Sequence, residues 1–259
     1  MKPRLVLLHG WAVNSLIWNP ILDRLKDRYE VTVLDLPGYG AQKNYNGDYD
    51  IQTVVADVLS RAPEVANWIG WSLGGTIAVA AAIAQPNRFE RLQLISTTPC
   101  FLSSSTWNHG IAAEPFEKLS ADFETNFDKA LKKFLLLQTF AEDPAEKKRS
   151  QQRSLVMVRE LIGLLGQTDP PSQQTLQSGL KLLRQTDLRQ QLSELAVKTQ
   201  VVAGETDRVV PIAASKYLFD NLPNTHSFKM LSGGHLPFLQ SPSDYIECLE
   251  EFIPSDGLV

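Results

Sequence analysis

The sequence predicts an α/β protein with a mostly parallel sheet and helices on both faces. Short apolar runs, rich in leucine or β-branched residues, alternate with longer segments of helical periodicity. Each apolar run is continuous, which is typical of strands covered on both faces. The 259 residues, 43% of them hydrophobic, supply enough material for a large core.

The expected elements follow one another in a regular order. We predict strands at 5–8, 31–34, 68–71, 92–95, 201–203 and 228–231. Helices are expected at 18–28, 51–62, 73–85, 213–221 and 243–253. The alternation of strand and helix is what makes a parallel sheet the expected arrangement.

The alternation stops between residues 99 and 189, where helical spacing continues without a convincing strand. One amphipathic helix is predicted from the spacing of Phe123, Phe127, Ala130, Leu131, Phe134, Leu135 and Gln138. Further helices are expected over 144–165 and 172–185, separated by the turn-forming Thr168-Asp169-Pro170-Pro171. We therefore expect a core of 1–98 and 190–259 and a helical lid of 99–189 over the carboxyl edge of the sheet. The alternative is a separate helical domain without a role at an active site.

Charge and composition argue against several classes of protein. The net charge of −4 and the pI of about 5.6 do not favour nucleic-acid binding. Two distant cysteines and four scattered histidines do not suggest a metal site. The apolar run 5–8 is too short for a signal peptide, and no segment is long enough to span a membrane, so a cytoplasmic location is expected.

A G-x-S-x-G motif, Gly70-Trp71-Ser72-Leu73-Gly74, lies between an expected strand and an expected helix. A serine at such a junction sits on a tight turn that exposes its hydroxyl, and flanking glycines relieve crowding there. We predict Ser72 as a nucleophile. The alternative is a serine that simply caps a helix.

Asp207 and His235 complete a catalytic triad in the chain order serine, acid, histidine. Asp207 follows the strand at 201–203, and His235 lies in a glycine-flanked loop after the last strand. All three residues thus follow strands of a parallel sheet, whose carboxyl ends build the sites of such folds. A turn-capping aspartate and a surface histidine are the alternatives.

Acyl transfer also needs donors for the developing oxyanion. The N–H of Leu73 supplies one, and the N–H of Trp11, after the first strand, is the expected second. His9 is predicted to stabilise a turn rather than to act as a base. Trp11 and Trp71 either flank the pocket or pack in the core.

The motifs together resemble the α/β-hydrolase superfamily across nearly the whole chain. The residues that carry this likeness are His9-Gly10-Trp11, Asp35-Leu36-Pro37-Gly38-Tyr39-Gly40, the serine motif, and the Asp207 and His235 loops. A closer likeness is to the pimeloyl-[acyl-carrier protein] methyl ester esterases of biotin synthesis. It rests on Gly70 to Gly75, Thr98-Pro99-Cys100-Phe101, Phe134-Leu135-Leu136-Leu137-Gln138-Thr139 and Thr186-Asp187-Leu188-Arg189-Gln190.

The resemblance implies a monomeric cytoplasmic serine carboxylesterase without cofactor or metal, acting on an ester carried by acyl carrier protein. It also implies substrate contacts from Trp11, Ser72, Leu73, Phe134, Leu135, Leu136, Leu137, Gln138 and His235. The chain departs from the family in two respects. It begins close to His9-Gly10, so the antiparallel edge strands that often open this fold are reduced or absent, and the stretch 140–153 matches only loosely.

Other functions remain open at this stage. A general short-chain esterase or a C–C bond hydrolase of the same superfamily would use the same residues. A ligand-binding protein on this fold is the alternative without catalysis. The serine nucleophile argues against relatives that attack with a carboxylate.

Basic residues gather within 129–153. Seven cations outnumber three acids there, a net charge of +4: Lys129, Lys132, Lys133, Lys147, Lys148, Arg149 and Arg153 against Glu142, Asp143 and Glu146. Lys129, Lys132 and Lys133 share one helix face by their spacing. We expect this face to dock an acidic carrier protein, the alternative being an ordinary solvated helix face.

Overall fold

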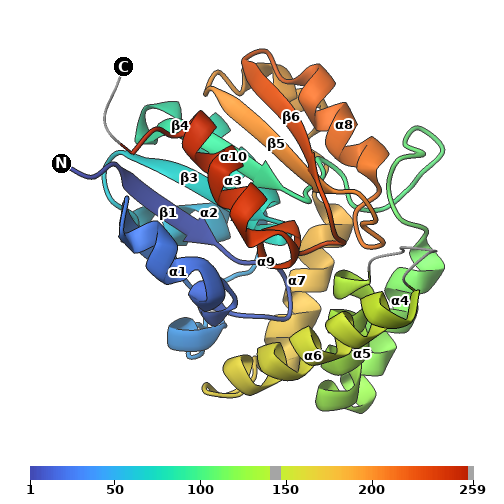
Figure 1. Cartoon of the computed structure of the whole chain (residues 1–259). Coiled ribbons are helices and arrows are strands. Elements are labelled where there is room, and N and C mark those ends of the chain that lie inside the picture. Colours follow the sequence, from blue (N-terminus) through green and yellow to red (C-terminus); the bar gives the residue numbers. More distant parts are fainter. Residues whose placement is uncertain (141–146, 256–259) are drawn as a thin grey trace.

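The computed structural model describes residues 1–140 and 147–255. Its six strands form one sheet in the order β2-β1-β3-β4-β5-β6, and every neighbouring pair is parallel (Figure 1). The strands are β1 (Arg4–Leu8), β2 (Glu30–Leu34), β3 (Ala66–Trp71), β4 (Phe89–Ile95), β5 (Thr199–Gly204) and β6 (Thr225–Leu231). All six predicted strands are confirmed, and β4 begins three residues earlier than its apolar run.

The first strand of the chain lies inside the sheet, between β2 and β3. Leu7 of β1 pairs with Val33 on one side and with Ile69 on the other. The strand order therefore reverses beside β1, and parallel sheets form their ligand crevices at such reversals, beyond the carboxyl ends of the strands. The loops that follow β1 and β3 meet there.

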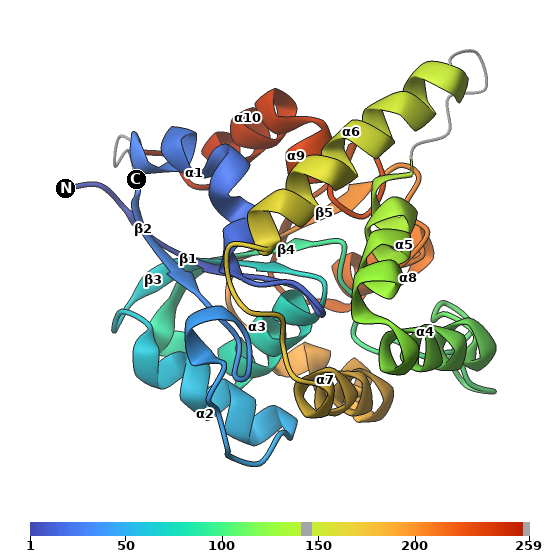
Figure 2. The same cartoon turned by 90° about the horizontal axis from the view of Figure 1, so that it is seen from below.

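Helices cover both faces of the sheet, as predicted. The helices α1 (Asn19–Lys26) and α10 (Pro242–Phe252) lie on one face, whereas α2 (Ile51–Arg61) and α3 (Leu73–Ala84) lie on the other (Figure 2). The helix α8 (Ile212–Asn221) packs against β5 and β6, and the short α9 (Pro237–Gln240) precedes α10. Small residues such as Ala78 and Ala81 let the buried α3 lie close to the sheet.

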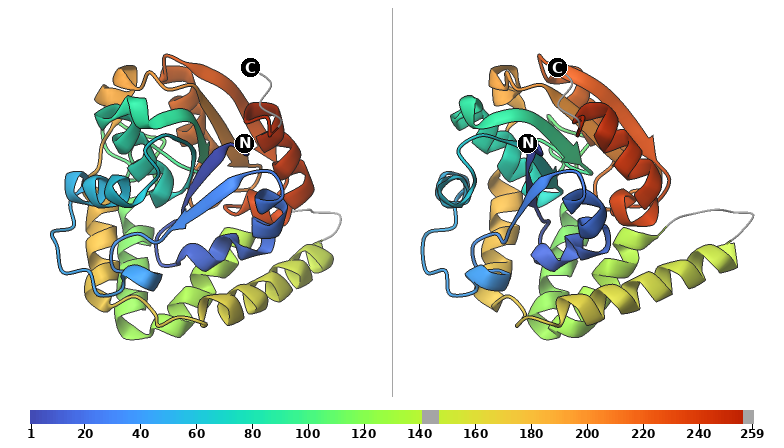
Figure 3. Two further views of the ribbon diagram at one scale, coloured as in Figure 1. Left: turned by 90° about the vertical axis from the view of Figure 1, so that its left-hand side faces the viewer. Right: turned by 60° about the vertical axis from the view of Figure 1, so that its left-hand side comes forward.

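In the described part of the chain between β4 and β5, four further helices lie beyond the carboxyl edge of the sheet (Figure 1). They are α4 (Ala113–Thr125), α5 (Phe127–Thr139), α6 (Lys147–Leu165) and α7 (Gln173–Gln185), here called the lid helices. The long α6 runs along the lid and projects past the core at its Lys147 end (Figure 3). Residues 144–146 of the predicted helix 144–165 lie outside the described residues.

The prediction of a single helix from Phe123 to Gln138 was wrong. Asn126 has an extended backbone, with φ −159°, and ends α4. Its side-chain oxygen accepts a hydrogen bond from Lys129 N at 2.9 Å and so caps α5. Phe123 and Phe127 still touch, with ring centroids 5.7 Å apart, because the apolar pattern continues across the break.

We expect Gly74→Ala to destabilise the fold, since α3 packs against the end of β1 at this position. A Cβ at Gly74 would lie 2.5 Å from the His9 carbonyl oxygen and 2.6 Å from that of Leu8. Overpacking of this kind costs about 1–3 kcal/mol in the free energy of unfolding, measurable in urea. Gly163→Ala on α6 is the matched control, because nothing lies within 4 Å of the added Cβ. That change should stabilise the protein by up to about 1 kcal/mol. Similar changes at both positions would contradict the packing argument.

Candidate active site

Ser72 occupies the sharp turn between β3 and α3. Its backbone has φ 55° and ψ −120°, a strained conformation for a residue with a side chain. The turn is held on both sides, because Ser72 N donates to the Ile95 carbonyl at 3.0 Å and the Ser72 carbonyl accepts from Gly75 N at 2.9 Å. The side chain consequently projects above the carboxyl edge of the sheet, at the N-terminus of α3.

The loop after β1 lies against this turn. A Cβ at Gly10 would be 3.2 Å from Ser72 Cβ and 3.0 Å from the Trp71 ring, so any larger residue would crowd both side chains. The backbone that leads to Trp11 is thereby held beside Ser72. The N–H groups of Trp11 and Leu73, predicted as oxyanion donors, belong to the two segments that meet here.

His235 and Asp207 are joined by a buried hydrogen bond. The distance between His235 Nδ1 and Asp207 Oδ2 is 2.8 Å, and the two side chains are only 1% and 2% exposed. The other oxygen of Asp207 accepts from Val209 N at 2.8 Å and from Val210 N at 2.9 Å. These donors fix the carboxylate, and the carboxylate holds the imidazole with Nδ1–H toward it.

Trp71 connects the histidine loop to the serine turn. Its indole N–H donates to the His235 carbonyl at 2.8 Å, and the two rings lie 5.4 Å apart. His235 Nε2 is buried and has no hydrogen-bond partner among the described residues. The structure thus joins His235 to Asp207, but it forms no hydrogen bond between His235 and Ser72. Such contacts are often longer without substrate.

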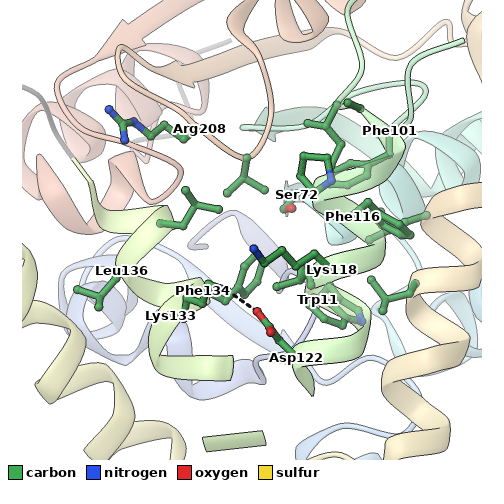
Figure 4. Close-up of a pocket in the computed structure, with 18 of the residues that line it drawn as sticks. Trp11, Ser72, Phe101, Phe116, Lys118, Asp122, Lys133, Phe134, Leu136 and Arg208 are labelled. Atoms are coloured by element: carbon green, nitrogen blue, oxygen red, sulfur yellow. Dashed lines mark hydrogen bonds and ion pairs between the residues drawn. The ribbon is translucent and has the colours of Figure 1, made fainter. Parts of the chain in front are cut away.

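A cavity of about 690 Å³ opens above Ser72. Its wall is mostly apolar and combines core residues with residues of α4, α5, α7 and the segment before α4. The core contributes Trp11, Ser72 and Val209, and the largest lid side chains are Phe101, Phe116, Phe134 and Phe140. Ser72 faces the space between Phe101, Phe116 and Trp11 (Figure 4). Cavities of about 300–1,000 Å³ suit small organic ligands.

The predicted substrate residues of α5 divide between two faces of the helix. Phe134, Leu136 and Leu137 line the cavity, whereas Leu135 and Gln138 are buried on another face and do not. The Gln138 carbonyl instead accepts a hydrogen bond from His235 N at 2.7 Å. Leu73 and His235 are likewise buried beside the cavity rather than in its wall.

The cavity wall also has charged residues, of which only Lys133 was predicted from the sequence to have a role. Lys118, Asp122, Lys133 and Arg208 contribute to its wall, and Lys133 forms an ion pair with Asp122 across α4 and α5 (Figure 4). The hydrogen bond from Lys133 lowers the pKa of the Asp122 carboxyl group. No sequence signal marks Lys118 or Asp122, since helical spacing places them on a face without saying what it encloses.

The three predicted docking lysines are exposed on α5 but differ in surroundings. Lys129 and Lys132 face away from the cavity, whereas Lys133 both lines it and pairs with Asp122. Of the three, only Lys129 and Lys132 can therefore be substituted to test the outer surface of the lid without changing the cavity wall.

His9 is a buried residue of the neighbouring turn. Its Nδ1 lies 2.7 Å from the Gly10 carbonyl, and its Nε2 accepts from Leu36 N at 2.9 Å. Burial lowers the pKa of His9 to about 4, although the nearby Asp35 carboxylate acts in the opposite direction. The ring is therefore neutral at pH 7 and holds the loop after β1.

The described residues include no cluster of three or more histidine, cysteine or acidic side chains that could hold a metal ion. Among the helices described, none combines the length and apolar character needed to cross a bilayer.

Comparison with known proteins agrees with the geometry. The model of the alpha/beta hydrolase fold family matches residues 3–242. The chain belongs to the α/β-hydrolase family. The pimeloyl-[acyl-carrier protein] methyl ester esterase of Xanthomonas oryzae pv. oryzae is 35% identical over 98% of this chain and 96% of its own. The protein of that name from Pectobacterium atrosepticum is 34% identical over 94% of this chain and 91% of its own. The resemblance predicted from the motifs is confirmed.

Solved structures show the same α/β-hydrolase fold. An esterase from Exiguobacterium antarcticum has a TM-score of 0.83 at 23% identity, covering 98% of this chain and 93% of its own. A bromoperoxidase from Bacillus anthracis has a TM-score of 0.84 at 19% identity, covering 98% and 92%. Because one fold carries such different activities, the activity of this chain depends on the residues of its site.

We expect the buried His9 to make this α/β-hydrolase less stable in acid. Between pH 6.5 and about 4 the unfolded chain binds a proton at this residue that the folded chain does not. The stabilisation from a neutral His9 is complete above pH 6.5 and is lost as the pH falls toward 4, by on the order of 3 kcal/mol. His9→Gln should lower stability at pH 7.5 and flatten this part of the pH dependence, as measured by urea unfolding. An unchanged slope in the variant would contradict the assignment.

Proposed function

We propose that this protein is a serine carboxylesterase that removes the methyl group from a pimeloyl ester attached to acyl carrier protein. The observation that carries the proposal is 35% identity, over 98% of the chain, to an esterase named for that activity. The largely apolar cavity whose wall includes Ser72 supports it, because a neutral ester on a hydrocarbon chain suits such a wall.

The proposed reaction uses the Ser72, His235 and Asp207 side chains. His235 Nε2 takes the hydroxyl proton as Ser72 Oγ attacks the ester carbonyl, and the Leu73 and Trp11 N–H groups stabilise the oxyanion. The protonated His235 then passes its proton to methoxide, which leaves as methanol. Water attacks the acyl-enzyme by the same route, regenerates Ser72 and releases the carboxylic acid.

The lid, proposed as residues 99–189, would hold the acyl chain. Phe134, Leu136 and Leu137 face the cavity and supply apolar surface for methylene groups. Leu135 and Gln138 support the wall from behind. We also propose that the enzyme acts as a monomer in the cytoplasm, as the family resemblance implies.

The proposal is tested by incubating the protein with pimeloyl-[acyl-carrier protein] methyl ester and following loss of the methyl group by mass spectrometry. Complementation of a biotin-requiring strain that lacks this esterase tests it in the cell. Hydrolysis of small esters without action on the carrier-bound ester would instead indicate a general short-chain esterase.

We expect Ser72→Ala to abolish ester hydrolysis in a folded protein. Asp207→Asn should lower kcat by on the order of 10⁴-fold, because the amide favours the wrong imidazole tautomer. Asp187→Asn and Asp220→Asn are matched controls, since these carboxylates pair with Arg189 and Lys216 away from the cavity. Turnover of p-nitrophenyl butyrate measures all four variants. A larger loss at Asp187 or Asp220 than at Asp207 would refute the assignment of the acid.

We expect the outer face of α5 to attract an acidic carrier protein. Lys129→Glu and Lys132→Glu should each raise KM for the carrier-bound ester, roughly tenfold at low ionic strength, and reduce its salt dependence. Neither side chain lines the cavity, so KM for small esters should stay unchanged. Lys198→Glu provides the control, because this exposed lysine precedes β5 at the opposite edge of the sheet. Equal effects on both substrates, or the same effect in the control, would reject this docking face.

A further inference from the structure

The C-terminal end of α5 is bonded to the loops that carry the proposed acid and base. The last carbonyls of a helix have no partner within the helix and commonly face water. Here three consecutive carbonyls accept from core loops: Gln138 from His235 N at 2.7 Å, Thr139 from Gln240 Nε2 at 2.8 Å, and Phe140 from Thr206 Oγ1 at 3.2 Å. Thr206 precedes Asp207, so α5 is connected to both loops.

Thr206 Oγ1 contacts both the Phe140 carbonyl, at 3.2 Å, and the Gly233 carbonyl, at 3.0 Å. Gln240, on the short helix α9, makes a second side-chain bridge within this group of contacts. Its Oε1 accepts from Gly234 N at 2.7 Å while its Nε2 donates to the Thr139 carbonyl at 2.8 Å. One amide therefore binds the residue before His235 and the end of α5 at the same time. The side chain is half-buried and does not line the cavity.

The backbone of the histidine loop is in direct contact with α5. A Cβ at Gly234 would lie 2.4 Å from the Gln138 carbonyl oxygen and 2.8 Å from that of Phe140. No room exists for the two segments to shift toward each other, and the bridge opposes their separation. The position of the His235 backbone is thus set by α5 as well as by β6.

We propose that Gln240 is a positioning residue that fixes His235 relative to Ser72 by clamping its loop to the lid helix α5. The proposal rests on the role of His235 as the base of the proposed reaction. Asp207 and its hydrogen bond orient the imidazole ring, whereas Gln240 and α5 hold the backbone from which the ring extends. A small displacement of a base away from its proton lowers the rate strongly, with about 10²-fold for 1 Å as a guide.

Two substitutions separate the two halves of the bridge. Gln240→Glu keeps an oxygen acceptor for Gly234 N but loses the donor to Thr139, whereas Gln240→Met keeps the length and loses both bonds. Ser241→Ala is the matched control, because Ser241 Oγ donates to the Ser232 carbonyl of the same loop and does not reach α5. Each protein is assayed with p-nitrophenyl butyrate at temperatures well below its measured Tm.

Both Gln240 variants should lower kcat by roughly 10- to 100-fold with KM within about twofold of wild type, because the clamp acts on the base and not on the cavity. The apparent pKa in the pH profile of kcat/KM, which reports the base, should shift as well. Ser241→Ala should keep the wild-type kcat and pH profile. These readouts differ from those of a purely structural role, which would lower Tm alone.

A wild-type kcat in folded Gln240→Glu would overturn the proposal that Gln240 acts through its bond to α5. A Gln240 variant with a lowered Tm but a wild-type pH profile would also overturn it. Should Gln240→Met fail to fold, Gln240→Glu alone decides. The test uses a small ester, so it stands apart from the carrier experiment. Failure on the carrier-bound ester rejects the proposed substrate, whereas an active Ser72→Ala protein rejects the triad on which the clamp depends.

Discussion

The strained backbone of Ser72 is the constraint on which the rest of the site depends. A conformation with φ 55° and ψ −120° costs about 1–3 kcal/mol and persists only where the surroundings fix it. Here β4 accepts the Ser72 N–H through Ile95, and α3 packs without a gap against the end of β1 at Gly74. The same packing places the loop of Trp11 beside the serine, so the turn and the predicted oxyanion donors form together.

The lid helices cover the cavity and also pack directly against the residues that surround Ser72. Trp11 donates its indole N–H to the Leu176 carbonyl of α7 at 3.0 Å and packs against Phe123 and Phe134. Asn14, after β1, donates to Thr168 Oγ1 at 2.8 Å. Together with the bonds from α5 to the loops of Asp207 and His235, these contacts couple the cavity wall to the carboxyl edge of the sheet. A change in the lid therefore acts on the geometry of the proposed catalytic groups.

The sequence predicted the strands and the order of the candidate triad because both depend on local signals. Continuous apolar runs mark covered strands, and the serine motif occurs where strand and helix must meet. The break at Asn126 was missed because a helical apolar pattern continues on both sides of it. Only the extended backbone of Asn126 ends α4, and its side chain caps α5. Which residues of α5 line the cavity could not be predicted from the sequence either. Leu135 and Leu136 differ only in which neighbouring element each one meets.

The wall of the cavity also affects how the substrate and the product of the proposed reaction are bound. Methyl ester hydrolysis converts a neutral group beside Ser72 into a carboxylate, and an apolar wall solvates such a charge poorly. The charged residues of the wall do not remove this cost: Lys133 is paired with Asp122, and Lys118 and Arg208 are exposed to solvent. The cavity should therefore hold the ester better than the acid produced from it. The same apolar surface that binds the acyl chain would then favour release of the product once its charge has formed.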